Sequence, residues 1–226
     1  MTVAAVVLAP SRADALSRVA GVAAIRRIAD VAWAGGALPI VIVADGQAAS
    51  SDLGEPLSGA SGTVIAPSRS GESDTLARFA EGISSARDEV EGTDAALLWP
   101  GRYAHLDAET VTSLIEAHGM HPDVALVPSY GGTPGWPVLL PLAAAATLSQ
   151  VAGTPLAELP AALRAAGVRT RLIELGDPGI VHDLGTAAGD LPDFSGPPEP
   201  AGANAPDWGD RVPEADPSPA PPRGAR

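Results

Sequence analysis

The feature that most constrains the fold is a regular alternation of short apolar runs with stretches of helical periodicity. The first run, Val3–Leu8, contains no polar residue, and four comparable runs follow at residues 39–44, 63–66, 95–99 and 124–127. Strands of this kind are typical of a sheet that is covered on both faces. The alternation therefore predicts a three-layer, Rossmann-like α/β fold, with helices on both faces of a mostly parallel sheet.

The stretches between these runs have the spacing of amphipathic helices. In the first of them, apolar residues recur at helical spacing from Val19 to Ala32, and Gly35-Gly36 should end the helix. Similar stripes predict helices after Ser73 and from about Asp107. Beyond residue 130 the pattern changes, and we expect helices at residues 142–150 and 156–166 and extended segments at residues 136–140, 169–175 and 180–184.

Composition limits both the core and the chemistry. Hydrophobic residues make up 46% of the 226 residues but aromatic residues only 4%, so the core must consist mainly of aliphatic side chains. All 14 basic residues are arginine. The absence of lysine excludes a P-loop with its phosphate-binding lysine and any reaction through a lysine Schiff base. The absence of cysteine excludes disulfides, thiolate metal sites and cysteine nucleophiles.

Charge and segment composition define the organisation of the chain. The formal net charge of −13 argues against a nucleic-acid partner, because binding to phosphates needs clustered basic residues. The apolar N-terminus ends at Pro10 and is too short for a signal peptide or a membrane span. Residues 192–226 contain ten prolines and four glycines. We expect a cytoplasmic, soluble protein in which residues 1–191 form one domain and residues 192–226 form a disordered acidic tail.

In open α/β sheets, ligands bind at the carboxyl ends of the strands, near the point where the strand order reverses. The loops that follow the predicted strands are therefore the candidate binding segments. They begin with Pro10-Ser11-Arg12, Asp45-Gly46-Gln47, Pro67, Pro100-Gly101-Arg102 and Pro128.

Taken in order, these loops resemble those of the MobA-like NTP transferase family, which includes the molybdenum cofactor guanylyl- and cytidylyltransferases. Val6-Val7-Leu8-Ala9-Pro10-Ser11-Arg12 resembles the opening strand and loop of the family, and residues 29–43 resemble the helix, glycine turn and strand that follow. Further similar segments are residues 70–76, 99–107, 132–139 and 181–186. The resemblance covers about residues 3–191, and it implies a divergent member with a nucleotide-diphospho-sugar-transferase-like fold.

The resemblance also implies which residues meet a nucleotide. The candidate nucleotide-binding residues are Leu8, Ala9, Pro10, Ser11, Gly71, Ser73 and Thr75. The last three stand at a predicted helix start, where free N–H groups favour an anion. A plain strand-to-helix turn and ordinary capping by Ser73 are the alternatives. Arg12, Arg18 and Arg102 are candidate phosphate contacts, in a chain that lacks the lysine of the family's opening motif.

A second candidate region is the stretch that resembles the family's acceptor-side motif. It contains Gly135, Trp136 and Pro137, with tryptophan where the family usually has histidine. A large aromatic ring in such a loop can stack on a pterin or a base, which makes these three residues candidate substrate-binding residues. Packing of Trp136 in the core is the alternative.

The family transfers a nucleotidyl group when a phosphate oxygen attacks the α-phosphorus of an NTP and displaces pyrophosphate, a reaction that uses Mg²⁺. Two aspartates usually hold the metal, and the resemblance places Arg102 and Gly185 at their positions. Asp183 remains as a candidate metal ligand. The guanidinium of Arg102 would take the place of the cation by pairing with a phosphate.

These residues leave three functions open. The first is nucleotidyl transfer of the molybdenum-cofactor type, with Mg²⁺, CTP or GTP, and molybdopterin as acceptor. The second is a relative with weakened or lost catalysis that binds a nucleotide or a pterin and serves a molybdenum enzyme as an accessory protein. The third is transfer to another small phosphate or a sugar. Loss of both metal carboxylates favours weakened or lost catalysis.

Overall fold

The structure is a computed structural model that describes residues 1–71 and 74–196. One eight-stranded sheet runs through the molecule in the order β10-β7-β9-β6-β1-β4-β5, with β8 beside β7. β9 is antiparallel to β6 and β7, and β8 to β7, whereas all other neighbours are parallel. This confirms the predicted α/β fold with a mostly parallel sheet. The strands are β1 (Val3–Leu8), β4 (Ile40–Ala44), β5 (Thr63–Pro67), β6 (Ala95–Pro100), β7 (Ala125–Tyr130), β8 (Thr133–Pro134), β9 (Val138–Pro141) and β10 (Thr170–Glu174).

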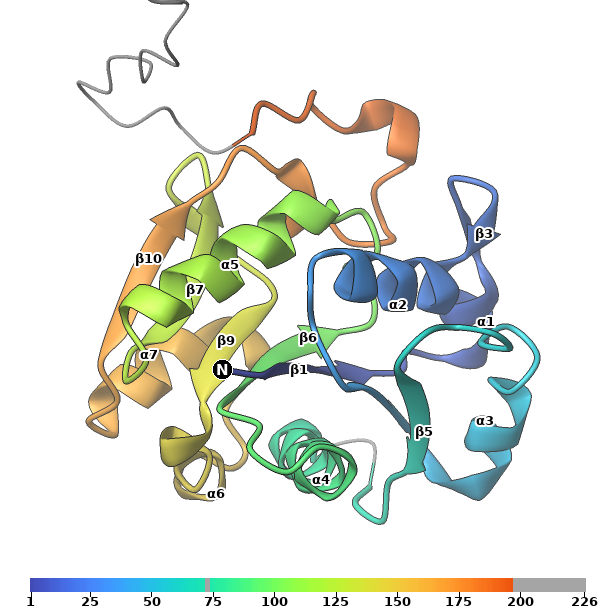
Figure 1. Cartoon of the computed structure of the whole chain (residues 1–226). Helices are drawn as coiled ribbons and strands as arrows, with labels where there is room; N and C mark the ends of the chain where they lie inside the picture. Colours follow the sequence, from blue (N-terminus) through green and yellow to red (C-terminus); the bar gives the residue numbers. More distant parts are fainter. Residues whose placement is uncertain (72–73, 197–226) are drawn as a thin grey trace, which may run out of the picture.

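Helices cover both faces of the sheet (Figure 1). On one face lie α2 (Ala24–Ala34) and α5 (Ala108–Met120), which pack against each other. On the other face lie α4 (Thr75–Glu89), α6 (Thr147–Gln150) and α7 (Leu159–Ala165). Successive residues of a strand point to opposite faces, so Ala5 and Val7 of β1 belong to the first core and Ala4 and Val6 to the second.

The helix predicted from residue 19 begins only at Ala24, which corrects that prediction. Residues 18–23 instead form a hairpin of β2 (Arg18–Val19) and β3 (Val22–Ala23). Its turn residues, Ala20 and Gly21, have φ angles of 50° and 85°, which a right-handed helix does not allow. The two valines of this hairpin have helical spacing without belonging to a helix.

The segment at residues 180–184, predicted as extended, forms no strand. A 3₁₀ turn, η3 (Pro178–Ile180), occupies its start, where the N–H of Gly179 donates to the Asp177 carboxylate at 2.8 Å. Local capping therefore replaces pairing with the sheet. The two helices predicted after residue 141 are present but interrupted, since η1 (Leu142–Ala144) precedes α6 and η2 (Leu156–Glu158) precedes α7.

The first residues of the predicted tail lie against the domain. After η4 (Ala188–Asp190), the chain returns to the segment that follows β10, where the N–H of Ser195 donates to the carbonyl of Gly176 at 3.0 Å. The remainder of the predicted tail, residues 197–226, lies outside the described residues. Among the helices that the structure does describe, none combines the length and the apolar character that a membrane crossing requires.

One buried histidine gives the fold a testable pH dependence. His118 of α5 is 1% exposed, and its Nδ1 has no partner among the described residues. Burial lowers the pKa of this imidazole, although Asp94 acts in the opposite direction. Between the lowered pKa and the ordinary value of about 6.5, the unfolded chain binds more protons than the folded one, so stability falls as the pH falls through this window.

We therefore expect the free energy of unfolding, measured by urea denaturation, to decrease when the pH is lowered from about 7 to about 5.5. The decrease should be smaller in His118→Gln, which keeps a polar side chain that does not titrate. Equal decreases in the two proteins would contradict this role of His118.

Candidate functional site

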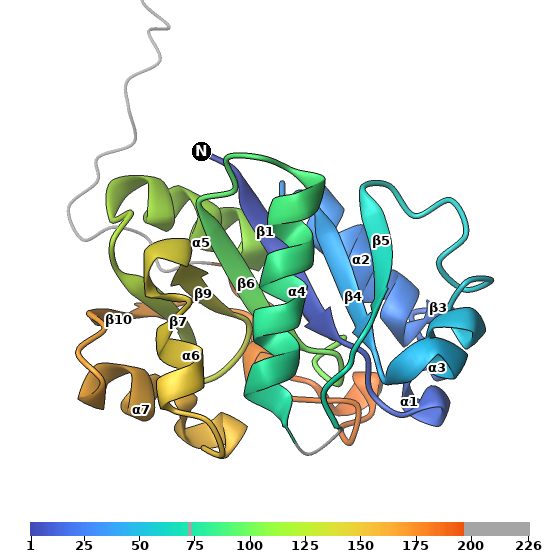
Figure 2. The ribbon, with the colours of Figure 1, turned by 90° about the horizontal axis from the view of Figure 1, so that it is seen from below.

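The topology places a candidate site where the strand order reverses. From β1 the chain moves to β4 and then β5 on one side, and it returns to β6 on the other side of β1. The loops after β1, β4 and β6 therefore meet at one edge of the sheet, the position at which open α/β sheets bind ligands. α1 (Arg12–Leu16), α3 (Gly46–Asp52) and the segment that follows β10 lie at this edge (Figure 2).

Arg102 is the centre of an ion-pair cluster in these loops. Its Nε donates to Asp183 Oδ2 at 2.9 Å, and its Nη1 donates to Asp14 Oδ2 at 2.5 Å. Gly185 lies beside this cluster, since a Cβ at this position would be 3.0 Å from Asp183 Oδ1 and 3.9 Å from Arg102 Nη2. The structure thus brings together the two positions that the resemblance assigns to metal-binding aspartates, with a guanidinium at one of them.

The charges in this cluster stabilise one another. The hydrogen bond to Asp183 raises the pKa of Arg102 above its ordinary value, with the negative charges of both aspartates adding to the effect. Partial burial raises the pKa of Asp183. The hydrogen bonds from the Gly185 N–H and Arg102, together with the charge of Arg102, outweigh this effect of burial. The pKa of Asp183 therefore lies below its ordinary value. Asp183 is therefore ionised and engaged at neutral pH.

Backbone contacts fasten the loops around this cluster. The carbonyl of Arg102 accepts the N–H of Leu184 at 2.9 Å, and the carbonyl of Leu8 accepts the N–H of Gly101 at 2.9 Å. Gly101 is required here, because a Cβ would come within 2.5 Å of the Leu8 oxygen. The indole of buried Trp99 donates to the carbonyl of Tyr103 at 2.9 Å. Arg102 is thus held between the ends of β1 and β6 and the 183–185 segment.

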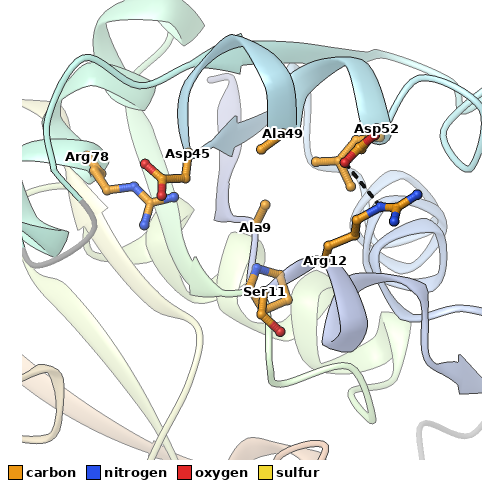
Figure 3. A pocket seen from close by; sticks show the side chains of 9 residues that line it. Ala9, Ser11, Arg12, Asp45, Ala49, Asp52 and Arg78 are labelled. Atoms are coloured by element: carbon orange, nitrogen blue, oxygen red, sulfur yellow. Dashed lines mark ion pairs between the residues drawn. The ribbon is translucent and has the colours of Figure 1, made fainter.

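A cavity of about 170 Å³ lies next to the ends of β1 and β4 (Figure 3). Arg12 borders the cavity, but its Nε pairs with Asp52 Oδ2 at 3.1 Å, so its charge is already engaged. Ser11 also borders it and accepts the N–H of Asp14 at 3.3 Å as the cap of α1. The lining residues are Ala9, Pro10, Ser11, Arg12, Asp45, Ala49, Asp52, Leu53 and Arg78.

Three of the candidate nucleotide-binding residues, Ala9, Pro10 and Ser11, therefore line a cavity. Leu8 itself is the buried last residue of β1. At the second candidate segment, Asp74 caps α4 by accepting the N–H of Ala77 at 3.2 Å. Thr75 begins this helix, and Gly71 lies three residues before its cap. Ser73 lies outside the described residues.

Trp136 packs mainly in the core. The side chain is 5% exposed, and its ring stacks on Phe79 at a centroid distance of 6.5 Å and tilts against Tyr103 at 6.4 Å. Gly135 allows this position, because a Cβ would come within 2.1 Å of the Ile180 oxygen. A second cavity, of about 150 Å³, nevertheless exposes part of this region. Its lining residues are Tyr103, Thr133, Pro134, Gly135, Trp136, Leu156, Ala157, Pro160 and Val181.

Two charged residues of the site carry no motif that the sequence analysis recognised. Asp14 lies in α1, just after the segment that resembles the family's opening motif, and its pairing with Arg102 joins residues that are 88 positions apart. Arg78 lies within the α4 stripe and is only 5% exposed. A charged residue next to Phe79 in an apolar stripe is the signal that could have identified it.

The donor set for a metal ion is incomplete. Within residues 1–71 and 74–196, no three histidine, aspartate or glutamate side chains gather in a metal-binding arrangement. Arg102 stands between the two nearest carboxylates of the cluster and uses an oxygen of each.

Comparisons with known proteins agree with this architecture. The family model described as the MobA-like NTP transferase domain matches residues 12–172. No curated protein is significantly similar to the chain in sequence.

Solved structures share the fold. A nucleotidyl transferase from Methanothermobacter thermautotroptrophicus has a TM-score of 0.62 and 18% identity, covering 81% of this chain and 92% of that one. A 4-diphosphocytidyl-2C-methyl-D-erythritol synthase has a TM-score of 0.63 and 15% identity over 84% and 95%. The manganese complex of Rv0371C from Mycobacterium tuberculosis H37Rv has a TM-score of 0.60 and 16% identity over 77% and 88%. Since the family match spans well over half of the chain, the chain belongs to the MobA-like NTP transferase family.

Proposed function

We propose that this protein binds a nucleotide, CTP or GTP, at the carboxyl edge of the sheet, and that its nucleotidyl transfer is weakened or lost. The observation that carries this proposal is the position of Arg102, which joins Asp14 and Asp183 at the place where the resemblance puts the metal-binding aspartates of the family. Family membership supports nucleotide binding, and the cavity beside the opening loop supplies space for it.

A divalent cation does not fit the donors of this cluster. Mg²⁺ needs carboxylate oxygens that are free to coordinate it in near-octahedral geometry. The carboxylate of Asp183 accepts hydrogen bonds from both Arg102 and the Gly185 N–H, and Asp14 is paired with the same guanidinium. A cation here would also meet a guanidinium whose raised pKa keeps it charged.

The guanidinium can replace part of what a metal ion does but not all of it. Arg102 pairs with Asp183 through Nε and with Asp14 through Nη1, so its Nη2 is the planar donor that suits a phosphate oxygen. Transfer also requires strong polarisation of the α-phosphorus and stabilisation of the leaving pyrophosphate, for which this family uses divalent ions. A bound nucleotide would thus be held without the charge compensation that the reaction needs.

The second cavity supports a proposal for the second ligand. Its lining includes Tyr103 and the mostly buried Trp136, and aromatic side chains suit a flat ring such as a pterin. This supports molybdopterin as acceptor, or a role as a nucleotide- or pterin-binding accessory of a molybdenum enzyme. Transfer to a sugar or another small phosphate is the other candidate, because the fold is shared with enzymes of several substrates.

Calorimetric titration and a product assay test this proposal together. We expect GTP or CTP to bind with similar affinity in Mg²⁺ and in EDTA, because Asp14 and Asp183 are paired with Arg102 and leave no free carboxylate for the metal ion. In the presence of Mg²⁺ and molybdopterin, we expect no steady release of pyrophosphate. Steady release would overturn the loss of catalysis, and the absence of binding to any nucleotide would overturn the proposal as a whole.

A further inference from the structure

One face of the sheet continues at β10 beyond the helix that covers it. β10 is the last strand on its side, and α7 packs against it (Figure 1). Leu172 of β10 is the register partner of Val127 on β7, so the two side chains point to the same face. Val127 is buried in the core on this face, whereas Leu172 is 48% exposed. α7 contains only seven residues, and it leaves this apolar side chain partly uncovered.

A groove of about 200 Å³ lies between β10 and α7. Two arginines stand at it, Arg164 and Arg171. The Nε of Arg164 donates to Thr170 Oγ1 at 2.9 Å, and Arg171 contacts the ring of His121. Neither arginine forms an ion pair with a carboxylate of residues 1–71 and 74–196. The groove thus combines apolar walls with two uncompensated positive charges. Its apolar lining residues are Val127, Pro134, Ala157, Pro160, Ala161 and Leu172.

The chain contains a segment of complementary chemistry. The C-terminal segment, residues 197–226, includes one aromatic residue, Trp208, with Asp207 directly before it and Asp210 two positions after it. An indole is a large apolar group, and carboxylates pair with guanidinium groups. The net charge of the chain is −13, so an acidic segment is repelled by most of the protein. A groove with two uncompensated arginines is therefore favoured over the rest of the surface.

The last described residues lie next to the end of β10. The N–H of Ser195 donates to the carbonyl of Gly176 at 3.0 Å. Gly176 follows Leu172 by four residues, so their Cα atoms are no more than about 14 Å apart. Trp208 follows Gly196 by twelve residues, which span up to about 40 Å when extended. Trp208 is thus within reach of the groove, at a local concentration on the order of millimolar.

We propose that the groove between β10 and α7 binds the part of the C-terminal segment around Trp208 of the same chain. The indole lies on Leu172 and the apolar walls, and the two neighbouring aspartates pair with the two arginines of the groove. The other residues of the C-terminal segment have no side chain of comparable apolar area, so the contact is limited to this part. The groove shares Pro134, Ala157 and Pro160 with the second cavity, so the bound segment borders that cavity.

Disulfide trapping in the full-length protein tests this contact, because the wild-type chain contains no cysteine. Ala161→Cys is combined with Gly209→Cys, and the control combines Glu116→Cys with Gly209→Cys. Ala161 and Glu116 are both exposed, but Glu116 lies on α5, on the opposite face of the sheet. We expect the first pair to form an intramolecular disulfide at least about tenfold faster than the control pair. Adding Trp208→Ala should reduce the rate to that of the control.

Charge reversal tests the role of the two arginines. In the first cysteine pair, Arg164→Glu with Arg171→Glu should slow disulfide formation about fivefold, the effect of two exposed ion pairs. Reversing both aspartates beside Trp208 to arginine should then restore the rate. The control, Arg69→Glu with Arg87→Glu, reverses two exposed arginines elsewhere and changes the net charge equally, so the rate should change far less.

Three results would overturn the proposal. The first is an equal rate for the two cysteine pairs, and the second is a rate that does not depend on Trp208. The third is a disulfide between chains that forms faster at higher protein concentration, because the occupant would then be a second copy. If Ala161→Cys fails to fold, Ala157→Cys on the same wall replaces it. The test needs no nucleotide, so its result is independent of the proposed function.

Discussion

The double variant Arg102→Asp, Gly185→Asp should bind Mn²⁺ at least about tenfold more tightly than the wild type. The substitutions remove the guanidinium that occupies Asp14 and Asp183 and add carboxylates at both family positions. Removing Arg102 alone leaves two unpaired carboxylates, and the second substitution supplies another oxygen donor next to them. Gly185 tolerates the change, because the nearest atom to a new Cβ is the movable Oδ1 of Asp183 at 3.0 Å.

Electron paramagnetic resonance of free Mn²⁺ measures this binding directly. The control is Arg87→Asp, Ser149→Asp, which changes two exposed residues and the net charge by the same amount. If the control binds Mn²⁺ as tightly as the double variant, the tighter binding is explained by the change in net charge alone and not by a metal site at these positions. Equal binding by the wild type and the double variant would contradict the role assigned to Arg102.

Trp99→Ala should destabilise the protein by about 3–5 kcal/mol, the usual cost of truncating a buried tryptophan. Trp99 is 0% exposed and belongs to the core that α2 and α5 cover. Its indole also holds the carbonyl of Tyr103, next to Arg102. For a domain of this size, the loss corresponds to a decrease of about 6–20 °C in the melting temperature.

Thermal denaturation followed by circular dichroism measures this effect. Trp33→Ala is the control, because Trp33 is 47% exposed and its removal opens no closed cavity. We expect its melting temperature to change far less. A decrease for Trp99→Ala no larger than that for Trp33→Ala would show that the loop after β6 is not anchored through this core.

The strands of the sheet could be predicted because burial on both faces leaves an unbroken apolar run, as in Val3–Leu8. The antiparallel direction of β9 could not be predicted, because an apolar run has the same sequence pattern in a parallel and in an antiparallel strand. The direction depends instead on the turn at β8. The hairpin at residues 18–23 escaped prediction for a local reason. Its strands are two residues long, and its valines imitate a helical stripe.

The candidate site could be predicted where segments of the chain could be aligned with motifs of the family. Arg102 and Gly185 were matched to two separate motifs, and the structure places them within one cluster. Asp14 and Arg78 were not predicted to take part, because their roles arise from contacts distant in sequence. The ion pair of Asp14 spans 88 positions, and Arg78 contacts a carbonyl 35 positions away. Such contacts depend on the packing of helices against strands, which local patterns do not encode.

The most direct test of this account is a crystal structure of the wild-type protein grown with GTP and Mn²⁺, with anomalous diffraction recorded at the manganese edge. We predict that Arg102 remains between Asp14 and Asp183 and that no anomalous peak lies at coordination distance from Asp183. A manganese ion within about 2.3 Å of an Asp183 oxygen, with Arg102 displaced, would contradict the account.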